Sequence, residues 1–445
     1  MSSNIDRVKQ AGVVGAGGAG FPTHVKLGAS AEIIIANGAE CEPLLRVDQQ
    51  VMEYDTKLVV DGVRLAMEMT GANKGVICLK AKYKNAIARL EEVLENEEAD
   101  ISLLKLDNYY PSGDEQALVF EATGKVVPTG GIPIAAGAIV LNVSTLTNIA
   151  EAEEEIPVTQ KYVTITGAVE NPTTVKVPVG TKVSELVKYA GGPTREDGYE
   201  IILGGPAMGA VCEDWDTPVT KTLGGIIVLP AEHNLIYKKT APLDYQIKLS
   251  RSVCCQCNQC TMLCPRRTLG LETAPHMAVR ALAYGSGAGL PPESIVSCCE
   301  CGICTYFACT MGLMPSRVMG SMRGEILSKR VPFEKTESIG ASKDRPYKNL
   351  PVNRLINRLG LKRYDVAAPM EQEPLSIDQV VIPLRQHIGA PSEPCVSEGQ
   401  RVTTGDLIAK IPDEALGANI HASISGTVHS IKDGYIEIRG NGEGR

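Results

Sequence analysis

Apolar residues follow one another almost without interruption in three short segments near the N-terminal end of the chain. The segments are EIIIAN (32–37), VICLK (76–80) and ISLLKL (101–106). Short apolar runs of this kind are typical of strands that are buried within a sheet. We therefore predict three buried strands.

Two longer segments between these strands have the pattern of helices. They are TKLVVDGVRLAMEMTG (56–71) and YKNAIARLEEVLENEE (83–98). Strands that alternate with helices predict an α/β domain, which we place over residues 1–155. The Pro- and Gly-rich segments 109–116 and 126–137 are expected to form ordered loops over a site.

The pattern changes after the acidic segment EAEEEIP (151–157), which marks a domain boundary. The alternating segments KYVTITGAV (161–169) and TTVKVPVG (173–180) predict short strands, and TKVSELVKYAGG (181–192) predicts a helix that ends at its glycines. We expect a small α+β module over residues 158–235.

Three further regions complete the chain. Residues 245–330 carry most of the cysteines among helical sequence, and residues 331–375 are polar and interrupted by prolines, as in a linker with one short helix. Residues 376–445 are rich in predicted strands, which are separated by the turn signals SEGQ, TTGD, SISG and KDG. The sequence thus predicts a multidomain α/β protein that ends in a β-rich domain.

The composition narrows the function classes. The chain has 445 residues, of which 44% are apolar and 22% are charged, and its net charge is −8. This balance is typical of a globular protein, and the acidic charge argues against general nucleic-acid binding. Even the longest apolar run, GIPIAAGAIVLNV, is too short for a membrane span, and the N-terminal residues lack a secretory signal. We expect a cytoplasmic protein without a membrane span.

The distribution of the cysteines indicates metal rather than disulfides. Ten of the 14 cysteines lie within residues 254–309, and the other four are scattered. A disulfide framework of a secreted protein would distribute them along a short chain. The scattered four are Cys41, Cys78, Cys212 and Cys395.

The clustered cysteines form two arrays, C-x2-C-x2-C-x3-C-P and C-x2-C-x2-C-x4-C. Three thiolates at such spacing can bind three corners of an iron–sulfur cluster, and in two-cluster ferredoxins the fourth ligand comes from the other array. We therefore predict two 4Fe-4S clusters, with ligands Cys254, Cys257, Cys260 and Cys309 in one, and Cys264, Cys298, Cys301 and Cys304 in the other.

The second array departs from the ferredoxin pattern at its end. Four residues instead of three precede Cys309, and Thr310 stands where proline is usual. Cys255 and Cys299 each adjoin a predicted ligand; we favour free neighbouring thiols for both, with replacement of the ligand in a shifted register as the alternative. Two four-cysteine zinc sites are the other alternative, although zinc sites use separated C-x2-C pairs rather than triplets.

A glycine-rich segment near the N-terminus contains Gly15, Gly17 and Gly20 in the spacing G-x-G-x-x-G. A Rossmann site needs a full strand before these glycines and a helix that begins at the last of them. Here only AGVV precedes the glycines, and Pro22 interrupts the start of a helix. Glu40 lies at the expected distance from the glycines, but in a loop rich in carboxylates. We favour a glycine loop of another kind.

Four segments carry a resemblance to a known group of proteins. They are GAGGAGFPTHVKL (15–27), NGAECEPLLRVD (37–48), YYPSGDEQALVFEATGKVVPTGGIPIAAG (109–137) and VLNVST (140–145). They resemble the flavin-binding loops of the NADH-oxidising subunit of respiratory complex I and, more closely, the cluster-bearing subunit of the Rnf electron-transport complex. Over nearly the whole chain, the resemblance extends to the cobalamin reductases of propanediol-utilisation microcompartments.

The resemblance implies an FMN site in the first domain, with NADH as electron donor. Backbone N–H groups of a glycine loop would hold the phosphate, with Lys26 adding positive charge. Glu40 is the catalytic candidate. Complex I has Asp-Glu-Gly-Glu-Pro where this chain has Ala-Glu-Cys-Glu-Pro, so one carboxylate of the NADH site is missing. The implied cofactor contacts are Gly15, Gly17, Gly18, Gly20, Phe21, Lys26, Asn37, Glu40, Glu42, Gly113, Asp114, Glu115 and Asn142.

The residues themselves leave another interpretation open for two of these contacts. Without the resemblance, a solvated surface loop is the favoured interpretation of Glu40 and Glu42.

The resemblance also assigns folds to the other regions. Residues 158–235 are similar to a β-grasp module for soluble ligands, which in this group is proposed to contact cobalamin, and residues 245–330 resemble a helical two-cluster ferredoxin domain. Residues 376–445 resemble a barrel-sandwich hybrid. A carrier domain of that fold has a lysine at the hairpin where this chain has Ser423-Ile424-Ser425-Gly426, so we expect a docking or structural role.

These implications combine into one functional hypothesis and two alternatives. FMN accepts a hydride and releases single electrons to the clusters, which would reduce cobalamin toward cob(I)alamin, the nucleophile that an adenosyltransferase uses. The expected place is a bacterial microcompartment, with the adenosyltransferase and shell proteins as further partners. The alternatives are the electron-input subunit of an Rnf-type complex with ferredoxin as acceptor, and a scaffold whose clusters are structural.

Overall fold

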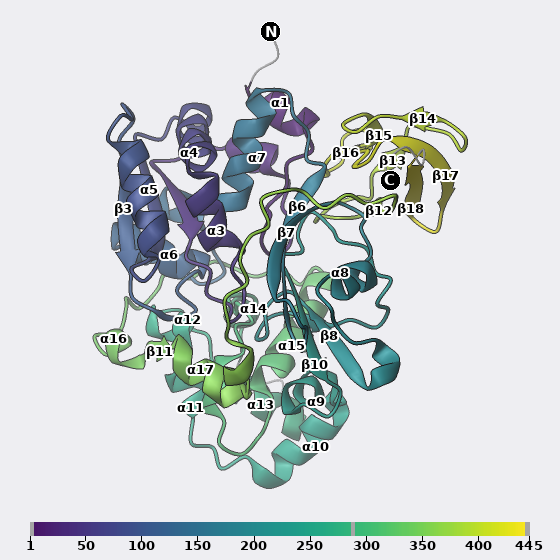
Figure 1. Cartoon of the computed structure of the whole chain (residues 1–445). Coiled ribbons are helices and arrows are strands. Elements are labelled where there is room, and N and C mark those ends of the chain that lie inside the picture. Colours follow the sequence, from purple (N-terminus) through teal and green to yellow (C-terminus); the bar gives the residue numbers. More distant parts are fainter. Residues whose placement is uncertain (1–3, 286–289, 441–445) are drawn as a thin grey trace.

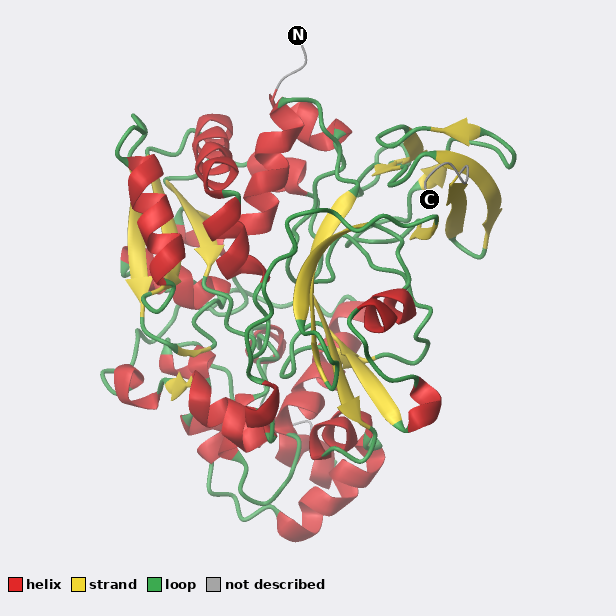
Figure 2. Cartoon of the chain, viewed as in Figure 1, coloured by secondary structure: helices red, strands yellow, loops and turns green. Residues whose placement is uncertain are grey.

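The computed structural model describes residues 4–285 and 290–440, and it begins with an α/β domain (Figures 1 and 2). The sheet of this domain has the order β3-β2-β1-β5, and all its pairings are parallel. The strands are β1 (Ile33–Gly38), β2 (Lys74–Lys80), β3 (Ile101–Leu106) and β5 (Ala138–Asn142). The helical elements are α1 (Asn4–Gln10), α2 (Thr23–Leu27), α3 (Val47–Tyr54), α4 (Thr56–Thr70), α5 (Lys84–Leu94), α6 (Glu115–Thr123), η1 (Pro133–Ala136) and α7 (Val143–Glu153).

The apolar pattern of the sequence explains this domain. β1 and β2 are buried along nearly their whole length, because apolar clusters cover both faces of the sheet. α4 packs closely against α7, and at Gly62 even a Cβ would collide with the backbone of Leu146. α4 ends at Gly71, whose φ of +71° favours glycine. The three predicted strands and both predicted helices are confirmed, but the prediction of burial is wrong for β3, which lies at the sheet edge and is only partly buried.

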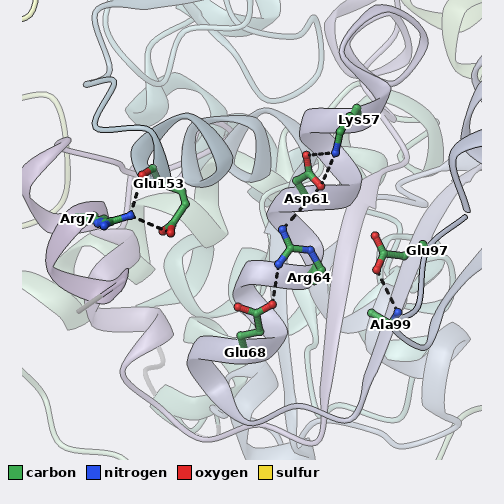
Figure 3. A network of polar contacts seen from close by, with 8 residues as sticks. All are labelled: Arg7, Lys57, Asp61, Arg64, Glu68, Glu97, Ala99 and Glu153. Atoms are coloured by element: carbon green, nitrogen blue, oxygen red, sulfur yellow. Dashed lines mark hydrogen bonds and ion pairs between the residues drawn. The ribbon is translucent and has the colours of Figure 1, made fainter. Parts of the chain in front are cut away.

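The outer surface of this domain carries the polar face of α4 (Figure 3). Asp61 accepts Lys57 Nζ at 2.7 Å, and Arg64 pairs with Glu68 one turn further along at 2.7 Å. Exposed pairs of this spacing add only about 0.3–0.5 kcal/mol each. The stability of α4 therefore comes from its buried face.

The second region is a five-stranded mixed sheet of order β7-β6-β10-β8-β9, with α8 packed against it. It runs through the centre of Figure 1 and joins the other parts. Its elements are β6 (Gln160–Gly167), β7 (Thr173–Pro178), α8 (Val183–Tyr189), η2 (Arg195–Asp197), β8 (Tyr199–Leu203), β9 (Ala210–Val211) and β10 (Gly225–Pro230). The predicted strand–strand–helix order is confirmed.

Short helices carry the cysteines at the bottom of Figure 1. They are α9 (Asn234–Thr240), α10 (Leu243–Val253), α11 (Gln259–Met262), α12 (Pro265–Thr268), α13 (Pro275–Tyr284), α14 (Pro292–Val296), the π-helical turn η3 (Cys304–Ala308) and α15 (Pro315–Ser328). A small apolar core holds α13, α14 and α15 together. Four of these helices, α12 to α15, begin with proline. The first residue of a helix has no partner within the helix for its N–H, so proline, which lacks that group, is well suited to this position.

The segment that follows α15 packs against three other parts of the chain. α17 (Val352–Leu359) buries Val352, Leu355, Ile356 and Leu359 on one face, as an amphipathic helix does. The short strand β11 (Leu350–Pro351) pairs with β4 (Tyr109–Tyr110) of the first domain. The segment also contains α16 (Arg345–Lys348) and η4 (Lys362–Tyr364). It is therefore an integral part of the core and not a free tether.

The C-terminal domain consists of two facing sheets, β12-β18-β17-β14 and β13-β15-β16, with an apolar core between them. The strands are β12 (Gln379–Pro383), β13 (Glu393–Pro394), β14 (Arg401–Val402), β15 (Leu407–Lys410), β16 (Ile420–His421), β17 (Gly426–Lys432) and β18 (Tyr435–Gly440). Among the described helices of the protein, none combines the length and apolar composition that a membrane span requires.

Candidate functional site

A cavity of about 390 Å3 opens where β1 and β5 end. In parallel α/β sheets, ligands commonly bind at the carboxyl ends of the strands. Eleven of the thirteen residues that the resemblance assigned to the flavin line this cavity: Gly15, Gly17, Gly18, Gly20, Phe21, Lys26, Asn37, Gly113, Asp114, Glu115 and Asn142. We call it the flavin cavity.

The glycine loop, residues 15–21, forms one wall of the flavin cavity. The N–H of Gly15 donates to the carbonyl of Phe21 at 3.0 Å, and Val14 and Pro22 form an isolated bridge. Gly18 has a φ of +86°, and a Cβ built there would meet nothing within 4 Å. A glycine in this conformation leaves the backbone open to a ligand. The loop is followed by a helix of only five residues, so the Rossmann geometry is absent here.

Three lysines donate to backbone carbonyls around this loop. Lys26 Nζ contacts Val140 O at 2.6 Å, Lys161 Nζ contacts Ala16 O at 2.8 Å, and Lys221 Nζ contacts Gly12 O at 2.7 Å. The latter two come from the β-grasp region and are buried, and burial lowers the pKa of Lys161 to about 8 and that of Lys221 to about 7. Lys161 thus anchors the loop itself, at Ala16, from a second domain, while Lys221 holds the segment just before it.

Asn37 and Asp114 fix the opposite wall. Asn37 Nδ2 donates to Gly113 O at 3.0 Å, and a Cβ at Gly113 would lie 2.6 Å from Ala39 O. Asp114 accepts the first N–H groups of α6 through Oδ1, and its Oδ2 accepts Arg266 at 2.7 Å. The Asp114 side chain of this ion pair is 5% exposed and the Arg266 side chain 11%, so little water reaches the pair. Arg266 therefore connects the flavin cavity to the cysteine region.

Asn142 and two carboxylates continue the wall beyond β5. Asn142 caps α7 and donates through Nδ2 to both carboxylate oxygens of Asp48 at 3.0 Å. Glu40 Oε2 accepts the backbone N–H of Asp48 at 3.1 Å. Burial raises the pKa of Asp48 to about 6, and burial together with the Asp48 charge raises the pKa of Glu40 well above its usual value. Glu40 is half-buried and bonded, so a freely solvated loop is excluded.

Glu42 connects three regions of the molecule. Its Oε1 accepts the hydroxyl of Tyr110 at 2.8 Å, and its Oε2 accepts the backbone N–H of Ala207 at 2.8 Å. The same Tyr110 hydroxyl lies 2.8 Å from Cys301 O. Burial raises the pKa of Glu42. Among the described residues that line the flavin cavity, neither Glu40 nor Glu42 occurs.

The two cysteine arrays share an unusual backbone pattern. In the first array, Gln256 and Asn258 have φ values of +53° and +59°. In the second array, Glu300 and Gly302 occupy the corresponding positions with +55° and +74°. Left-handed residues at the same two places curve each C-x2-C-x2-C segment in the same way. The resemblance between the arrays is therefore structural and not only one of spacing.

The one-residue difference between the arrays is taken up by a π-helical turn. In the first array, α11 closes with ordinary helical hydrogen bonds. In the second, the N–H of Cys309 donates to Cys304 O at 3.2 Å, five residues back. A π-turn accommodates one extra residue within a helix. The turn explains how Cys309, which follows Cys304 after four residues, can take a position equivalent to that of Cys264, which follows Cys260 after three.

The thiols form two electrostatic groups. Burial raises the pKa of Cys260 to about 11, and its interacting neighbours are Cys309, Cys257 and Cys254. Burial raises the pKa of Cys304 as well, with Cys298 and Cys264 as its strongest neighbours. The first group has the predicted ligands, whereas the second also includes Cys299, which interacts with Cys264 and Cys298. Within the described residues, no three His, Cys, Asp or Glu side chains gather closely enough to hold a single metal ion.

Sequence reasoning missed several residues of this site. Cys299, Cys301 and Arg266 line the flavin cavity together with Cys41 and Met208. Asp48 belongs to the quoted segment NGAECEPLLRVD, but nothing in its position along the chain indicates that it meets Asn142. One signal in the sequence could have indicated Arg266, which follows Cys264 and Pro265. A charged residue next to a predicted cluster ligand is expected to be buried, and a buried charge needs an ionic partner.

Four family models match successive parts of the chain. They are the Nuo51 FMN-binding domain over residues 8–151, the SLBB domain over 162–211, a 4Fe-4S dicluster domain over 253–314 and the RnfC barrel sandwich hybrid domain over 360–441. The predicted fold class is thereby confirmed, as are an FMN-binding domain and an iron–sulfur domain.

Three curated relatives show how far the similarity extends. Cobalamin reductase PduS of Salmonella typhimurium is 43% identical over 438 residues, which cover 97% of this chain and 95% of the relative. Cobalamin reductase PduS of Citrobacter freundii is 41% identical over the same coverage. One component of the Na(+)-translocating ferredoxin:NAD(+) oxidoreductase complex of Acetobacterium woodii is 35% identical over 60% of this chain and 59% of its own. The chain therefore belongs to the family of the PduS cobalamin reductases, which is related to components of ferredoxin:NAD(+) oxidoreductase complexes.

Proposed function

We propose that this chain is an NADH-dependent oxidoreductase that reduces cob(III)alamin and cob(II)alamin toward cob(I)alamin, with FMN and two 4Fe-4S clusters as cofactors. One observation carries the proposal beyond the family relation. Cys299 and Cys301 of the second array line the flavin cavity, so the flavin site and one set of predicted cluster ligands share a wall. Neighbouring redox sites of this kind suit electron transfer.

The flavin cavity fits FMN in size and in chemistry. Its volume of about 390 Å3 lies in the range of small-molecule sites, and the glycine loop leaves the backbone accessible at Gly18. Lys26 places an ammonium group at the cavity wall, where it would neutralise phosphate. Asn37, Asp114 and Asn142 are each fixed by hydrogen bonds, so they would orient the ring without rearrangement.

When bound, FMN supplies the conversion between the two electrons of a hydride and the single electrons that a cluster carries. The chain's own residues hold that chemistry in place. Glu40 and Asp48 have raised pKa values and are joined by a hydrogen bond, so they can hold a proton at a carboxylate oxygen behind the cavity wall. We assign Glu40 a positioning role in place of direct contact.

The cysteine arrays fit iron–sulfur clusters through their all-sulfur donor sets. We propose Cys254, Cys257, Cys260 and Cys309 as ligands of the first cluster, and Cys264, Cys298, Cys301 and Cys304 as ligands of the second; the interactions of Cys260 and Cys304 support this division. We also propose the domain limits 1–155, 158–235, 245–330, 331–375 and 376–445. Two observations support the cluster assignment, namely the repeated left-handed backbone and the π-turn at Cys309.

The test uses the full chain, reconstituted anaerobically, with iron and flavin counted. We expect NADH to bleach the flavin absorbance and then the clusters, and added cob(II)alamin to be converted to cob(I)alamin. Lys26→Ala should lower flavin occupancy, and its control, the exposed Lys57→Ala, should not. Clusters that NADH cannot reduce, even with added FMN, would favour the scaffold alternative and refute the proposal.

The second candidate function is electron input to a membrane-associated complex. The 35% identity to the component of the Acetobacterium woodii complex favours it over the part of the chain that matches. The same protein preparation distinguishes the two functions, because an electron-input component should reduce ferredoxin faster than cob(II)alamin.

For the reductase, we propose an adenosyltransferase in a bacterial microcompartment as the partner, since cob(I)alamin must be consumed by alkylation. A coupled assay with and without that enzyme tests it.

A further inference from the structure

The C-terminal domain contacts the first domain at the glycine loop, although the two are far apart in the sequence. It is the yellow domain at the upper right of Figure 1. Asn419 Nδ2 donates to Gln10 O at 3.4 Å, and Gln386 and His387 are only 5% and 7% exposed. We call this contact the joint, and its residues are Gly12, Gly20, Lys221, Gln386, His387 and Asn419.

Gly12, just before the glycine loop, has no room for a side chain. A Cβ built there would collide with Asn419 O of the C-terminal domain and lie 2.8 Å from Lys221 Nζ. Its φ of +68° also favours glycine. The backbone of the C-terminal domain therefore fixes the chain where it enters the loop.

Gly20, near the other end of the loop, is enclosed in the same way. A Cβ built there would lie 2.8 Å from Thr222 Cγ2 and 3.1 Å from both Gln386 O and His387 Cα. Gly20 also lines the flavin cavity. This residue therefore has the cavity on one side and the C-terminal domain on the other.

The glycines between these two positions have open surroundings. A Cβ at Gly15 or Gly17 would meet its nearest atom at 3.6 or 3.7 Å, which is ordinary van der Waals contact, and a Cβ at Gly18 would meet nothing within 4 Å. All three line the flavin cavity. The C-terminal domain thus touches the two ends of the glycine segment and leaves its middle free for a ligand.

Lys221 of the β-grasp region connects three domains at the joint. Its Nζ donates to Gly12 O at 2.7 Å and to Asn419 O at 2.8 Å, and its backbone N–H donates to Gln386 Oε1 at 3.0 Å. Lys221 is only 3% exposed, so these hydrogen bonds lie away from water. Breaking one of them would leave a buried polar group unpaired, which is costly. The joint is therefore held by specific contacts.

The C-terminal side of the joint is braced by its own hydrogen bonds. Gln386 Nε2 donates to Pro383 O at 3.1 Å, and His387 Nε2 accepts the N–H of Ala418 at 3.1 Å. A glycine-rich loop without such a support would have many conformations, and binding a ligand would then require all of them to be given up. A fixed support lowers that cost before the ligand arrives.

We propose that the C-terminal domain is a clamp for the glycine loop, which it holds in the FMN-binding conformation, so that the retention of FMN depends on the joint. Lys221 and Gln386 act as positioning residues, since neither is among the described residues that line the flavin cavity. The inference deepens the proposed function and rests only on its FMN site. Because coupling between two sites is reciprocal, bound FMN must stabilise the joint in return.

Two variants of the full chain open the joint from different sides. Lys221→Met removes both Nζ bonds, and Gln386→Leu removes the acceptor of the Lys221 N–H without a change of charge, so its effect cannot arise from attraction of the phosphate. The controls lose hydrogen bonds in the same two domains away from the joint. They are Lys182→Met, which loses Asp216, and Gln379→Leu, which loses Glu437.

The first measurement is an anaerobic fluorescence titration of FMN into flavin-free protein that retains its clusters, with iron counted. We expect FMN affinity to fall at least about fivefold in both test variants and to stay within about twofold in the controls, because only the former lose the support of the loop. Iron content should not change. Wild-type FMN affinity in both test variants would overturn the clamp.

The second measurement is hydrogen exchange of the wild-type chain with and without FMN, which does not depend on how the variants fold. FMN should slow exchange in segments 386–390 and 418–421, but not in β17 and β18 of the same domain. A merely structural joint would show no such protection, and its absence would overturn the clamp. A wild-type chain that binds FMN but does not reduce cobalamin would refute the proposed function and leave the clamp standing, whereas a chain that binds no FMN would refute both.

Discussion

The two cysteine arrays have the same backbone curvature but very different surroundings. In the first array, Cys255 and Cys257 are exposed, and the thiols border a small pocket of about 30 Å3. In the second array, Cys301 and Cys304 are buried, and Cys301 lines the flavin cavity. The spacing of the cysteines thus determines how ligands are presented, whereas the packing around them determines which cluster stands next to the flavin.

The arrays are also fastened by different contacts. The second array lies against Tyr110 of the first domain, whose hydroxyl is 2.8 Å from Cys301 O. The Arg266–Asp114 pair stands next to Cys264, the cysteine of the first array that we propose as a ligand of the second cluster. In the first array, Thr261 shares a hydrogen bond of 2.7 Å with His276 of its own helical region. We infer that the second cluster receives electrons first, and that the first cluster is the more distant one.

The strongest test of this order removes one ligand from each array. Cys301→Ala and Cys257→Ala should each lose about half of the bound iron, because each array nucleates one cluster. Only Cys301→Ala should also stop the reduction of the remaining cluster by NADH, since the cluster beside the flavin is gone. Iron analysis and anaerobic absorbance after NADH addition measure both effects. Equal reduction of the remaining cluster in the two variants would refute the order.

The next largest effect is expected at Arg266. Arg266→Met removes the only cation described as paired with Asp114, whose side chain is buried. An uncompensated buried charge of this kind costs about 3–5 kcal/mol. The free energy of unfolding should fall by about that amount, and the second cluster should lose occupancy before the first. Arg267→Met, one residue away and without an ion pair among the described residues, is the control and should change stability by less than about 1 kcal/mol. A loss confined to the first cluster would contradict the comparison.

The sequence predicted the parts of the molecule whose physics is local. The apolar runs defined β1 and β2, because strands buried on both faces need continuous apolar residues. The run of β3 also marked a strand, although β3 lies at the sheet edge and is only partly buried. The cysteine spacing defined the two thiol groups, because ligands of one array are neighbours in the chain. The resemblance added the flavin-cavity residues, which the structure brings together.

Contacts between distant segments could not be predicted in this way. Glu42 was expected at the cofactor, but it meets a β-grasp loop 165 residues later in the chain. Lys161 and Lys221 look like ordinary lysines in the sequence, yet from another domain Lys161 bonds Ala16 O of the glycine loop and Lys221 bonds Gly12 O just before it. The segment after α15 was expected to be a linker, and its amphipathic helix α17 is buried in a shared core. Such pairings depend on how the domains dock, and docking leaves no periodic signal.

A smaller effect is expected at Lys161, where a substitution should change the flavin site but neither cysteine array. Lys161→Met keeps the length of a buried side chain but removes its donor to Ala16 O. We expect FMN affinity to fall about tenfold, or about 1.4 kcal/mol, because the glycine loop loses an anchor and nearby positive charge. Flavin fluorescence titration measures it. Lys176→Met on the neighbouring strand β7, which pairs with Glu151 at 3.6 Å, is the control. Iron content should not change, and iron loss from the second array would show that cluster and flavin sites are not independent.

The smallest effect is expected at Tyr110, and it tests whether the contact of its hydroxyl with the second array influences the cluster as well as the stability of the fold. Tyr110→Phe removes the hydroxyl that lies 2.8 Å from both Cys301 O and Glu42 Oε1, and the loss of its one donor should cost about 1 kcal/mol at pH 5. Because burial raises the pKa of Glu42 and the Tyr110 hydrogen bond opposes that rise, the variant should raise it further. A group whose pKa is higher in the folded state loses stability as pH rises through that value, so the deficit should be larger at pH 8 than at pH 5. Tyr109→Phe, which loses a bond to Glu121 instead, is the control. Only Tyr110→Phe should alter the EPR signal of the second cluster, and an unchanged signal would mean that this hydroxyl stabilises the fold without touching the electron path.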